Sequence, residues 1–350
     1  RILTWRSTAA SKLSPFLMVK TFRAALGELL DWMEGAVRVR KTEQDLVRAV
    51  EISVDSGIPI LARGGGTSQC GQTVNEAVVI DCSRHLNKVI DFNPDEKKIT
   101  VQPGLVLDHL NAFLKPYGLF FPVDISTASR ATIGGMTANN SCGARSIHYG
   151  IMVDNVRAID AFLPTGEHFK FAQTPGELDK LSANQGYKQI VTQVRDIAYR
   201  QRTELEKRFP KLKRRVGGYN LDTVDPMGHN MAKLLVGSEG TLATFKTIEL
   251  QLHEIPKYRV MGVCHFPSFY SAMDATQHIV KLRPVAVELI DRTMIDLARD
   301  IPIFRPVVES FVKGEPGALL LVEFAGEEFQ YLPGKLKELD RLMSDLGYRD

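Results

Sequence analysis

The chain has 350 residues, of which 44% are hydrophobic and 24% are charged, and its formal net charge is +3. This length predicts two domains, and the composition is typical of globular proteins. The small net charge gives no support to nucleic-acid binding, and no apolar run approaches the roughly 20 residues that cross a bilayer.

Four cysteines are scattered along the chain without a C-x-x-C pair: Cys70, Cys82, Cys142 and Cys264. Their spacing predicts free thiols rather than a disulfide framework, a zinc site or an iron–sulfur site, and no metal site is predicted. We therefore expect a cytoplasmic protein without a transmembrane segment, with peripheral attachment to the inner membrane as the alternative.

The predicted elements begin with an amphipathic pattern in residues 1–35, which indicates a helical segment, and a short strand at 37–39. Thr42-Glu43-Gln44-Asp45 has the pattern of a capping box, and the helix that it starts ends at Gly57. The next predicted elements are strands at 58–62, 77–81 and 99–102 and a helix from Leu107 to Gly118.

Two glycine-rich stretches stand out, Arg63 to Gln72 and Ala131 to Ala144. The first follows a strand of a β-α-β unit, at the strand end where α/β sheets usually bind ligands. Glycine lets successive backbone N–H groups form a concave nest for phosphate oxygens. Two nests predict a ligand with two phosphates and a long body, which is a dinucleotide. The spacing matches neither the G-x-G-x-x-G fingerprint nor the G-x-x-x-x-G-K-[ST] loop.

The second half begins with a hairpin of strands at 156–163 and 168–171, followed by a charged, mainly helical region at 174–216. We place a domain boundary at Ile255-Pro256-Lys257, which divides the chain into segments 1–35, 36–256 and 257–350. The last segment is predicted to hold strands at 259–266, 286–290 and 318–324 and helices at 268–282 and 336–346. These strands are too few for a closed antiparallel sheet, so the second domain is expected to be incomplete.

A set of motifs in this order resembles the FAD-binding domain of the vanillyl-alcohol-oxidase-type (PCMH-type) flavoproteins. They are Arg63-Gly64-Gly65-Gly66-Thr67-Ser68, Gln102-Pro103-Gly104, Pro122-Val123-Asp124, Ser129 to Gly135, Asn139 to Ala144, His148-Tyr149-Gly150, Gly217 to Leu221 and Gly237 to Leu242. Within that superfamily, the sequences of these motifs are most similar to the branch of glycolate oxidase and the D-lactate and D-2-hydroxyglutarate dehydrogenases. The resemblance implies an α+β fold, with an FAD-binding domain of two α/β subdomains followed by a partial antiparallel-sheet substrate domain of the FAD-linked oxidase C-terminal type.

The resemblance also implies the roles of the motif residues. Gly64 to Ser68 are expected to wrap the diphosphate, Asp124 to Thr127 and Asn139 to Ala144 to line the flavin and ribityl chain, and Glu239 to Thr241 to close the adenine and phosphate side. For Glu239, a surface carboxylate in a strand turn is the alternative. The implied cofactor-binding residues are Arg63, Gly64, Gly65, Gly66, Thr67, Ser68, Gly71, Gln72, Pro122, Asp124, Ser126, Thr127, Thr132, Gly134, Gly135, Asn139, Asn140, Ser141, Cys142, Gly143, Ala144, Tyr149, Gly150, Glu239, Gly240 and Thr241.

Many members of the superfamily attach FAD through a histidine directly after the glycines, where this chain has Thr67. Threonine cannot form that bond, so non-covalent FAD is expected. Cys142 is an alternative point of attachment, although a small packed thiol is the plainer reading.

The resemblance implies an FAD-dependent oxidoreductase that oxidises a small D-2-hydroxy acid by hydride transfer to flavin N5. Its electrons are expected to pass to a quinone, cytochrome, electron-transfer flavoprotein or iron–sulfur module that this chain does not encode. The basic run from Lys207 to Arg215 holds candidates for the substrate carboxylate, with a solvated basic face as the alternative. His148 and Tyr149 are expected near the flavin ring. The catalytic residues remain unassigned, because the family's Gly-His-x-Gly motif does not occur after Lys257.

Two other functions stay open. In the second, the chain is a truncated or non-catalytic flavin-binding subunit of a larger flavin and iron–sulfur dehydrogenase. The third is a reductase of the cell-wall UDP-sugar pathway, which shares the flavin fold and needs an NADPH-side domain that the sequence does not reveal.

Overall fold

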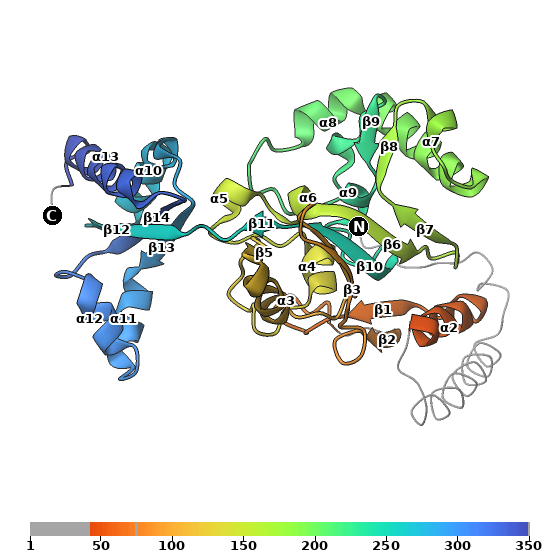
Figure 1. Cartoon of the computed structure of the whole chain (residues 1–350), viewed down its shortest axis with the longest axis horizontal. Coiled ribbons are helices and arrows are strands. Elements are labelled where there is room, and N and C mark those ends of the chain that lie inside the picture. Colours follow the sequence, from red (N-terminus) through yellow and green to blue (C-terminus); the bar gives the residue numbers. More distant parts are fainter. Residues whose placement is uncertain (1–42, 74–75, 349–350) are drawn as a thin grey trace.

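The computed structural model describes residues 43–73 and 76–348. It has two bodies joined by the chain between β11 (His253–Glu254) and β12 (Tyr258–Phe266) (Figure 1). The helix and strand predicted within residues 1–39 lie outside the described residues. The division at 36–256 and 257–350 stays a prediction. None of the described helices combines the length and the apolarity that crossing a membrane requires.

The first element confirms the predicted helix, whereas Thr42 of the predicted capping box lies outside the described residues. Helix α2 (Glu43–Asp55) is followed by Gly57, whose φ of 63° lies in the left-handed region that favours glycine. Leu46 and Val50 of α2 pack against Cys82 and Phe162. The helix leads into β1 (Ile60–Arg63), which pairs in parallel with β2 (Val78–Asp81). This parallel pair delivers the chain to the first glycine-rich stretch.

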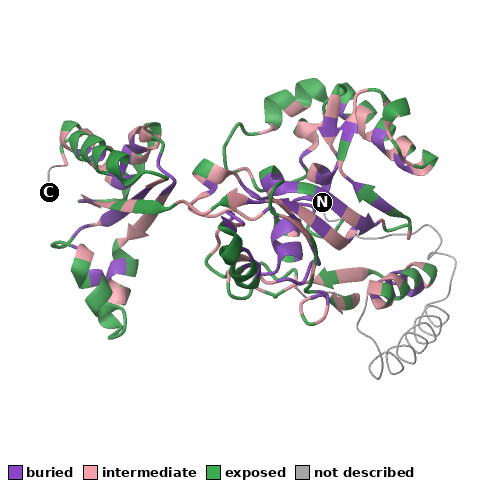
Figure 2. Ribbon diagram, in the orientation of Figure 1, coloured by how far each residue is buried: buried purple, intermediate pink, exposed green. Residues whose placement is uncertain are grey.

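A five-stranded antiparallel sheet forms the centre of the larger body, in the order β3-β4-β10-β6-β7. Its strands are β3 (Val89–Asn93), β4 (Lys98–Val101), β10 (Thr244–Gln251), β6 (Val156–Phe162) and β7 (His168–Phe171). The predicted hairpin is β6 and β7. Strand β10, which the sequence analysis did not identify, fills the middle of the sheet and buries Ile248 and Leu250 completely. The buried residues follow this sheet (Figure 2).

Short helices and strands pack on the sheet and carry the second glycine-rich stretch. They are α3 (Leu107–Leu114), η2 (Lys115–Tyr117), β5 (Leu119–Phe120), α4 (Ile133–Asn139), α5 (Ser146–Tyr149), α6 (Met152–Asn155), α9 (Ala232–Leu235) and β11. As predicted, the helix that starts at Leu107 stops at Gly118, whose φ is 69°. Large side chains of these elements are fully buried, among them Leu110, Ile133 and Met152.

The region predicted as mainly helical, 174–216, is helical only in part. It contains η3 (Leu178–Lys180), α7 (Gln185–Arg200) and α8 (Arg202–Arg208). Strand β8 (Gln173–Pro175) pairs with β9 (Gly228–Asn230), and η4 (Leu221–Thr223) lies between α8 and β9. Helix α8 ends before Phe209, because Pro210 disfavours helical backbone there, and residues 209–216 form no helix.

The smaller body is a three-stranded antiparallel sheet in the order β12-β14-β13, with β13 (Ala286–Asp291) and β14 (Ala318–Gly326). These strands confirm the predicted ones. One face packs against α10 (Phe269–Ile279) and α13 (Leu332–Asp345), which η5 (Val280–Leu282) and η6 (Phe329–Tyr331) flank. The other face packs at one end against α11 (Arg292–Asp300) and α12 (Arg305–Phe311), which the sequence analysis did not identify.

The uncovered end of that second face carries an ion pair with the larger body. Arg145 donates from Nη2 to Glu323 Oε2 at 3.1 Å, and its Nη1 lies 3.7 Å from Asp124 Oδ2. Glu323 is only 7% exposed, and its Oε1 lies 3.6 Å from Nε of Arg259. Arg145 Nε and Glu323 Oε1 are both buried, and neither has a hydrogen-bond partner in the described part of the chain. The pair therefore makes one of the two hydrogen bonds of a bidentate arrangement.

We expect this ion pair to couple the two bodies energetically. Arg145→Met and Glu323→Gln should each lower the free energy of unfolding by about 1–3 kcal/mol, because each leaves the other, buried residue without its ion-pair partner. The double variant should lose less than the sum, with a coupling energy of about 1–2 kcal/mol in urea unfolding.

A surface pair provides the matched control. Lys257 and Glu327 lie 3.6 Å apart with side chains 70% and 55% exposed, so their cycle should couple by at most about 1 kcal/mol. The coupling would be contradicted if the loss of unfolding free energy in the double variant equalled the sum of the losses in Arg145→Met and Glu323→Gln within about 0.5 kcal/mol.

Candidate functional site

A cavity of about 770 Å³ opens beside the first glycine-rich loop. Both bodies contribute to it, because Glu288 of β13 joins the residues of the larger body. The main parts of its wall are residues 61–68, 124–127, 134–136, 141–144 and 239–240. Strand β1 positions the loop, and the turn before α5 positions residues 141–144.

The loop from Gly64 to Ser68 offers free backbone donors to this cavity. In the described part of the chain, none of its five N–H groups donates a hydrogen bond to a carbonyl. The loop also lies against backbone, since a Cβ on Gly65 would stand 2.2 Å from the carbonyl oxygen of Arg130. Glycine is therefore required for the close approach, and the amides remain free, as the predicted anion nest requires.

In the second glycine-rich stretch, two glycine amides have partners within the chain. Gly134 and Gly135 lie in the first turn of α4, where Gly134 N–H donates to Pro103 O at 2.7 Å and Gly135 N–H to Thr132 Oγ1 at 3.4 Å. These amides are thus already engaged. Gly134 is required for packing, because a Cβ there would stand 2.5 Å from the Pro103 side chain. The stretch lines the cavity as part of its wall.

Arg63 provides the positive charge beside the nest. Gly66, with φ of 66°, lies over its guanidinium, and a Cβ at Gly66 would stand 3.1 Å from Nη2. Arg63 Nε is buried and has no hydrogen-bond partner among the described residues, and Arg63 forms no ion pair with them. A partly buried, unpaired cation next to free amides is stabilised by an anion. The loop therefore fits the diphosphate of a dinucleotide.

The opposite wall is fixed by Asp124. Its Oδ1 accepts from the N–H of Arg145 at 3.1 Å, and Gly143 lies so close that a Cβ would overlap the Asp124 carbonyl. Cys142, next in the wall, is contacted by Arg214, whose Nη2 lies 3.1 Å from Cys142 Sγ. Glu323 of the smaller body thus connects through Arg145 to the cavity wall.

Three carboxylates line the cavity, and two of them have partners. Asp124 is held by Arg145, and Glu239 accepts from Asn139 Nδ2 at 2.8 Å. Glu239 has φ of 51° and is exposed, yet it lines the cavity. Glu288 has no hydrogen bond or ion pair with any described residue. It is therefore the lining carboxylate that is available to a ligand.

The structure brings most of the predicted cofactor-binding residues to this cavity. Those that line it are Arg63, Gly64, Gly65, Gly66, Thr67, Ser68, Gln72, Asp124, Ser126, Thr127, Thr132, Gly134, Gly135, Asn139, Ser141, Cys142, Gly143, Ala144, Glu239 and Gly240. Those that do not line it are Gly71, Pro122, Asn140, Tyr149, Gly150 and Thr241. Several of the latter have structural contacts instead. Asn140 is buried, ends α4 with φ of 57° and accepts from Val153 N–H at 3.0 Å.

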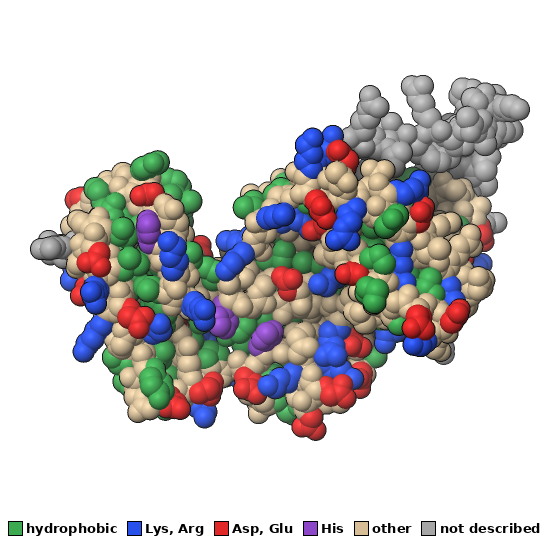
Figure 3. Space-filling model, turned by 90° about the horizontal axis from the view of Figure 1, so that it is seen from above, with side chains coloured by type: hydrophobic (Ala, Val, Ile, Leu, Met, Phe, Trp, Pro, Cys, Tyr) green, Lys and Arg blue, Asp and Glu red, His purple; other side chains and the backbone are tan. Residues whose placement is uncertain are grey.

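Tyr149 belongs to an aromatic group near the junction of the two bodies. Its ring meets Phe120 at 5.4 Å, His148 at 4.5 Å and His253 at 5.1 Å, all edge-on. Burial raises the pKa of Tyr149 and, together with the charge of His148, lowers that of His253. Histidine side chains are visible beside the narrowing between the bodies (Figure 3). No histidine of the described residues lines the cavity.

The sequence analysis missed several lining residues, including Arg214, Val216, Glu288 and Phe245. Arg214 stood in the basic run without being separated from its neighbours. Cys82 also lines the cavity, but burial raises its pKa to about 12, so it remains a neutral thiol. All four cysteines are free.

Comparison with known families assigns both bodies. Residues 35–172 match the family described as FAD binding domain, and residues 255–350 match the family described as FAD linked oxidases, C-terminal domain. The free-amide loop, Arg63 and most of the predicted wall fall within the first match.

Among curated relatives, the chain is 32% identical over 324 residues to a D-2-hydroxyglutarate dehydrogenase of Haemophilus influenzae, covering 89% of this chain and 32% of that protein. It is 28% identical to the mitochondrial cytochrome-type D-lactate dehydrogenase of Arabidopsis thaliana, covering 73% of this chain and 37% of that protein. The chain thus spans about a third of the length of these relatives.

Two solved structures share the fold. An alkyldihydroxyacetonephosphate synthase superposes with a TM-score of 0.61 at 20% identity, covering 88% of this chain and 50% of that one. p-Cresol methylhydroxylase superposes with a TM-score of 0.59 at 13% identity, covering 88% and 56%. The predicted α+β, PCMH-type fold is confirmed. The chain thus combines a segment that matches the FAD binding domain family with one that matches the C-terminal domain of FAD linked oxidases, and its cofactor is FAD.

Proposed function

We propose that the chain is the flavin-binding part of a dehydrogenase that oxidises a small D-2-hydroxy acid and passes the electrons to a separate carrier. The names of its curated relatives support this substrate class. The observation that carries the proposal is Arg214, a cation that lines the FAD cavity without a carboxylate partner.

Arg214 has the properties of a substrate-carboxylate ligand. Its guanidinium forms no ion pair with the described residues, and its one hydrogen-bond contact is the Cys142 thiol at 3.1 Å. A thiol is a weak acceptor, so most of the five donors remain available. An arginine fork binds a carboxylate by two parallel hydrogen bonds, which orients the acid as well as holding it.

The described residues divide the remaining tasks. The amides of Gly64 to Ser68 and the guanidinium of Arg63 would hold the FAD diphosphate. Bound FAD supplies the acceptor for the hydride that leaves C2 of the hydroxy acid. Glu288, the lining carboxylate without a partner, would accept a hydrogen bond from the substrate hydroxyl. Arg145 would keep Asp124 in the wall while it holds the second body.

We further propose the domain division at 36–256 and 257–350 and a cytoplasmic location, which the four free thiols favour. The electron acceptor would be a quinone, a cytochrome, an electron-transfer flavoprotein or an iron–sulfur module. A second function is favoured by one observation: the chain spans a third of its relatives' length. It would then hold FAD but turn over only within a longer protein.

Non-covalent FAD is the first expected outcome. Thr67 stands where a histidine would form the flavin bond, and Cys142 is already in contact with Arg214. Acid precipitation of the yellow protein should therefore release the flavin and leave a colourless pellet. A pellet that retains flavin absorbance after washing would contradict this, and Cys142→Ser would then identify the bond.

Gly65→Ala tests the glycine loop. The added Cβ would stand 2.2 Å from Arg130 O, so the loop must shift, at a cost of about 1–3 kcal/mol. We expect FAD affinity to fall by about tenfold or more, measured by flavin fluorescence during titration of the apoprotein.

Gly217→Ala is the control, because a Cβ there meets nothing within 4 Å. Circular dichroism and the thermal midpoint should show both variants to be folded. Equal FAD affinity for Gly65→Ala and the unmodified chain would remove the loop from the site.

Arg214→Gln tests the substrate proposal. Anaerobic mixing of the FAD-loaded chain with D-lactate, glycolate or D-2-hydroxyglutarate should bleach the flavin. In Arg214→Gln the acid concentration for half-maximal bleaching should rise about 10- to 100-fold, because a hydrogen bond to a charged group contributes about 1.5–3 kcal/mol.

Lys207→Gln is the matched control, since Lys207 belongs to the same basic run and does not line the cavity. It should bleach like the unmodified chain. FAD retention without bleaching by any acid would favour the non-catalytic alternative. Unchanged half-maximal bleaching in Arg214→Gln would exclude Arg214 as the carboxylate ligand.

A further inference from the structure

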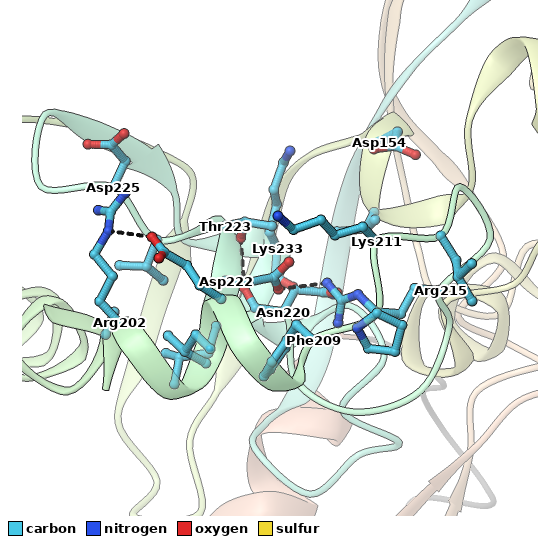
Figure 4. Close-up of a pocket in the computed structure, with 18 of the residues that line it drawn as sticks. Asp154, Arg202, Phe209, Lys211, Arg215, Asn220, Asp222, Thr223, Asp225 and Lys233 are labelled. Atoms are coloured by element: carbon cyan, nitrogen blue, oxygen red, sulfur yellow. Dashed lines mark hydrogen bonds and ion pairs between the residues drawn. The ribbon is translucent and has the colours of Figure 1, made fainter. Parts of the chain in front are cut away.

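A second cavity, of about 500 Å³, lies between α7, α8 and the segment 209–226 (Figure 4). None of its lining residues lines the FAD cavity. Its floor is partly apolar, with Phe209 and Leu212 among the lining residues. The family comparison assigns nothing to this region, which lies after the match at 35–172 and before the match at 255–350.

One short segment separates the two cavities. Lys213 and Arg215 line the second cavity, whereas Arg214 and Val216 line the FAD cavity. Residues 213–216, which include a turn at Lys213 and Arg214, therefore form a wall with two faces. Arg215 is fixed on its side by Asp222 Oδ1 at 2.6 Å and by the Phe209 ring at 4.8 Å.

The carboxylates of the second cavity are already engaged. Each of the four accepts a hydrogen bond from a neighbouring residue: Asp222 from Arg215, Glu206 from Arg202, Asp225 from the N–H of Met227 and Asp154 from the N–H of Ile151. Two of them are paired with arginines, and none forms an ion pair with Lys211, Lys213 or Lys233.

Two of the positive charges of the cavity are lysines from different elements. Lys211 comes from the segment after α8 and Lys233 from α9, and both line this cavity (Figure 4). Neither forms an ion pair with a described carboxylate. Two ammonium groups that face the same space repel each other, and an anion between them removes the repulsion. Each ammonium brings three donors to such a ligand.

We propose that this cavity binds a small organic dianion through Lys211 and Lys233. The lining holds six basic side chains, Arg195, Arg202, Lys211, Lys213, Arg215 and Lys233, against four acidic ones, so two negative charges balance it. Phe209 and Leu212 favour an organic body beside the charges. A dicarboxylate and a phosphate monoester share this chemistry. The proposal does not depend on the substrate of the FAD cavity.

The test is a calorimetric titration of the full purified chain at low ionic strength, first with succinate and separately with glycerol phosphate. At least one probe should bind saturably with a dissociation constant of about 1 mM or below. Saturation by succinate alone identifies a dicarboxylate site, and saturation by glycerol phosphate alone identifies a phosphate site.

Substitutions locate the site. Lys211→Gln and Lys233→Gln should each weaken binding about tenfold, because each removes a charged donor. Lys207→Gln, an exposed lysine of α8 outside both cavities, should bind like the unmodified chain. Circular dichroism confirms folding of each variant. Absence of saturation by both probes, or equal weakening in all three variants, would overturn the proposal.

Discussion

The architecture depends on the close approach of one glycine loop to the backbone of another segment. Gly65 lies against the carbonyl of Arg130, and Gly64 against the Thr132 hydroxyl, at separations that leave no room for a Cβ. This contact bends the chain after β1 so that its next N–H groups face a cavity instead of carbonyls. Unpaired amides are costly when a site is dry, so the loop gains most when an anion is present.

The cavity needs both bodies. Glu288 reaches it from β13, and the same face of that sheet presents Glu323 to Arg145. Arg145 in turn donates to Asp124 in the cavity wall. The ion pair that holds the bodies together and the wall that would contact the flavin thus share one arginine. Arg145 therefore ties the position of Asp124 to that of the second body.

Local patterns predicted many elements but not the centre of the sheet. Helix α2, strands β1, β2 and β4, the β6–β7 hairpin and the three strands of the second body follow from capping, glycine and apolar signals in neighbouring residues. Strand β10 does not, because Thr244 to Gln251 pairs with strands more than 80 residues away. For the same reason Glu288 and Arg214 were not singled out. Gly134 and Gly135 were predicted to belong to a nest, but their amides have partners within the chain. Glycine needed for packing in α4 has the same sequence pattern as glycine in a nest.

The alternation along residues 213–216 explains why the basic run was ambiguous. The composition of the run is compatible with both a solvated surface and a ligand site. In the structure its residues have both locations. Lys207 lies on the exposed helix α8, Arg214 lines the FAD cavity, and Lys213 and Arg215 line the second cavity. Pro210 disfavours helical backbone at Phe209, where α8 ends, and the turn at Lys213 and Arg214 that follows gives each cavity its own charge.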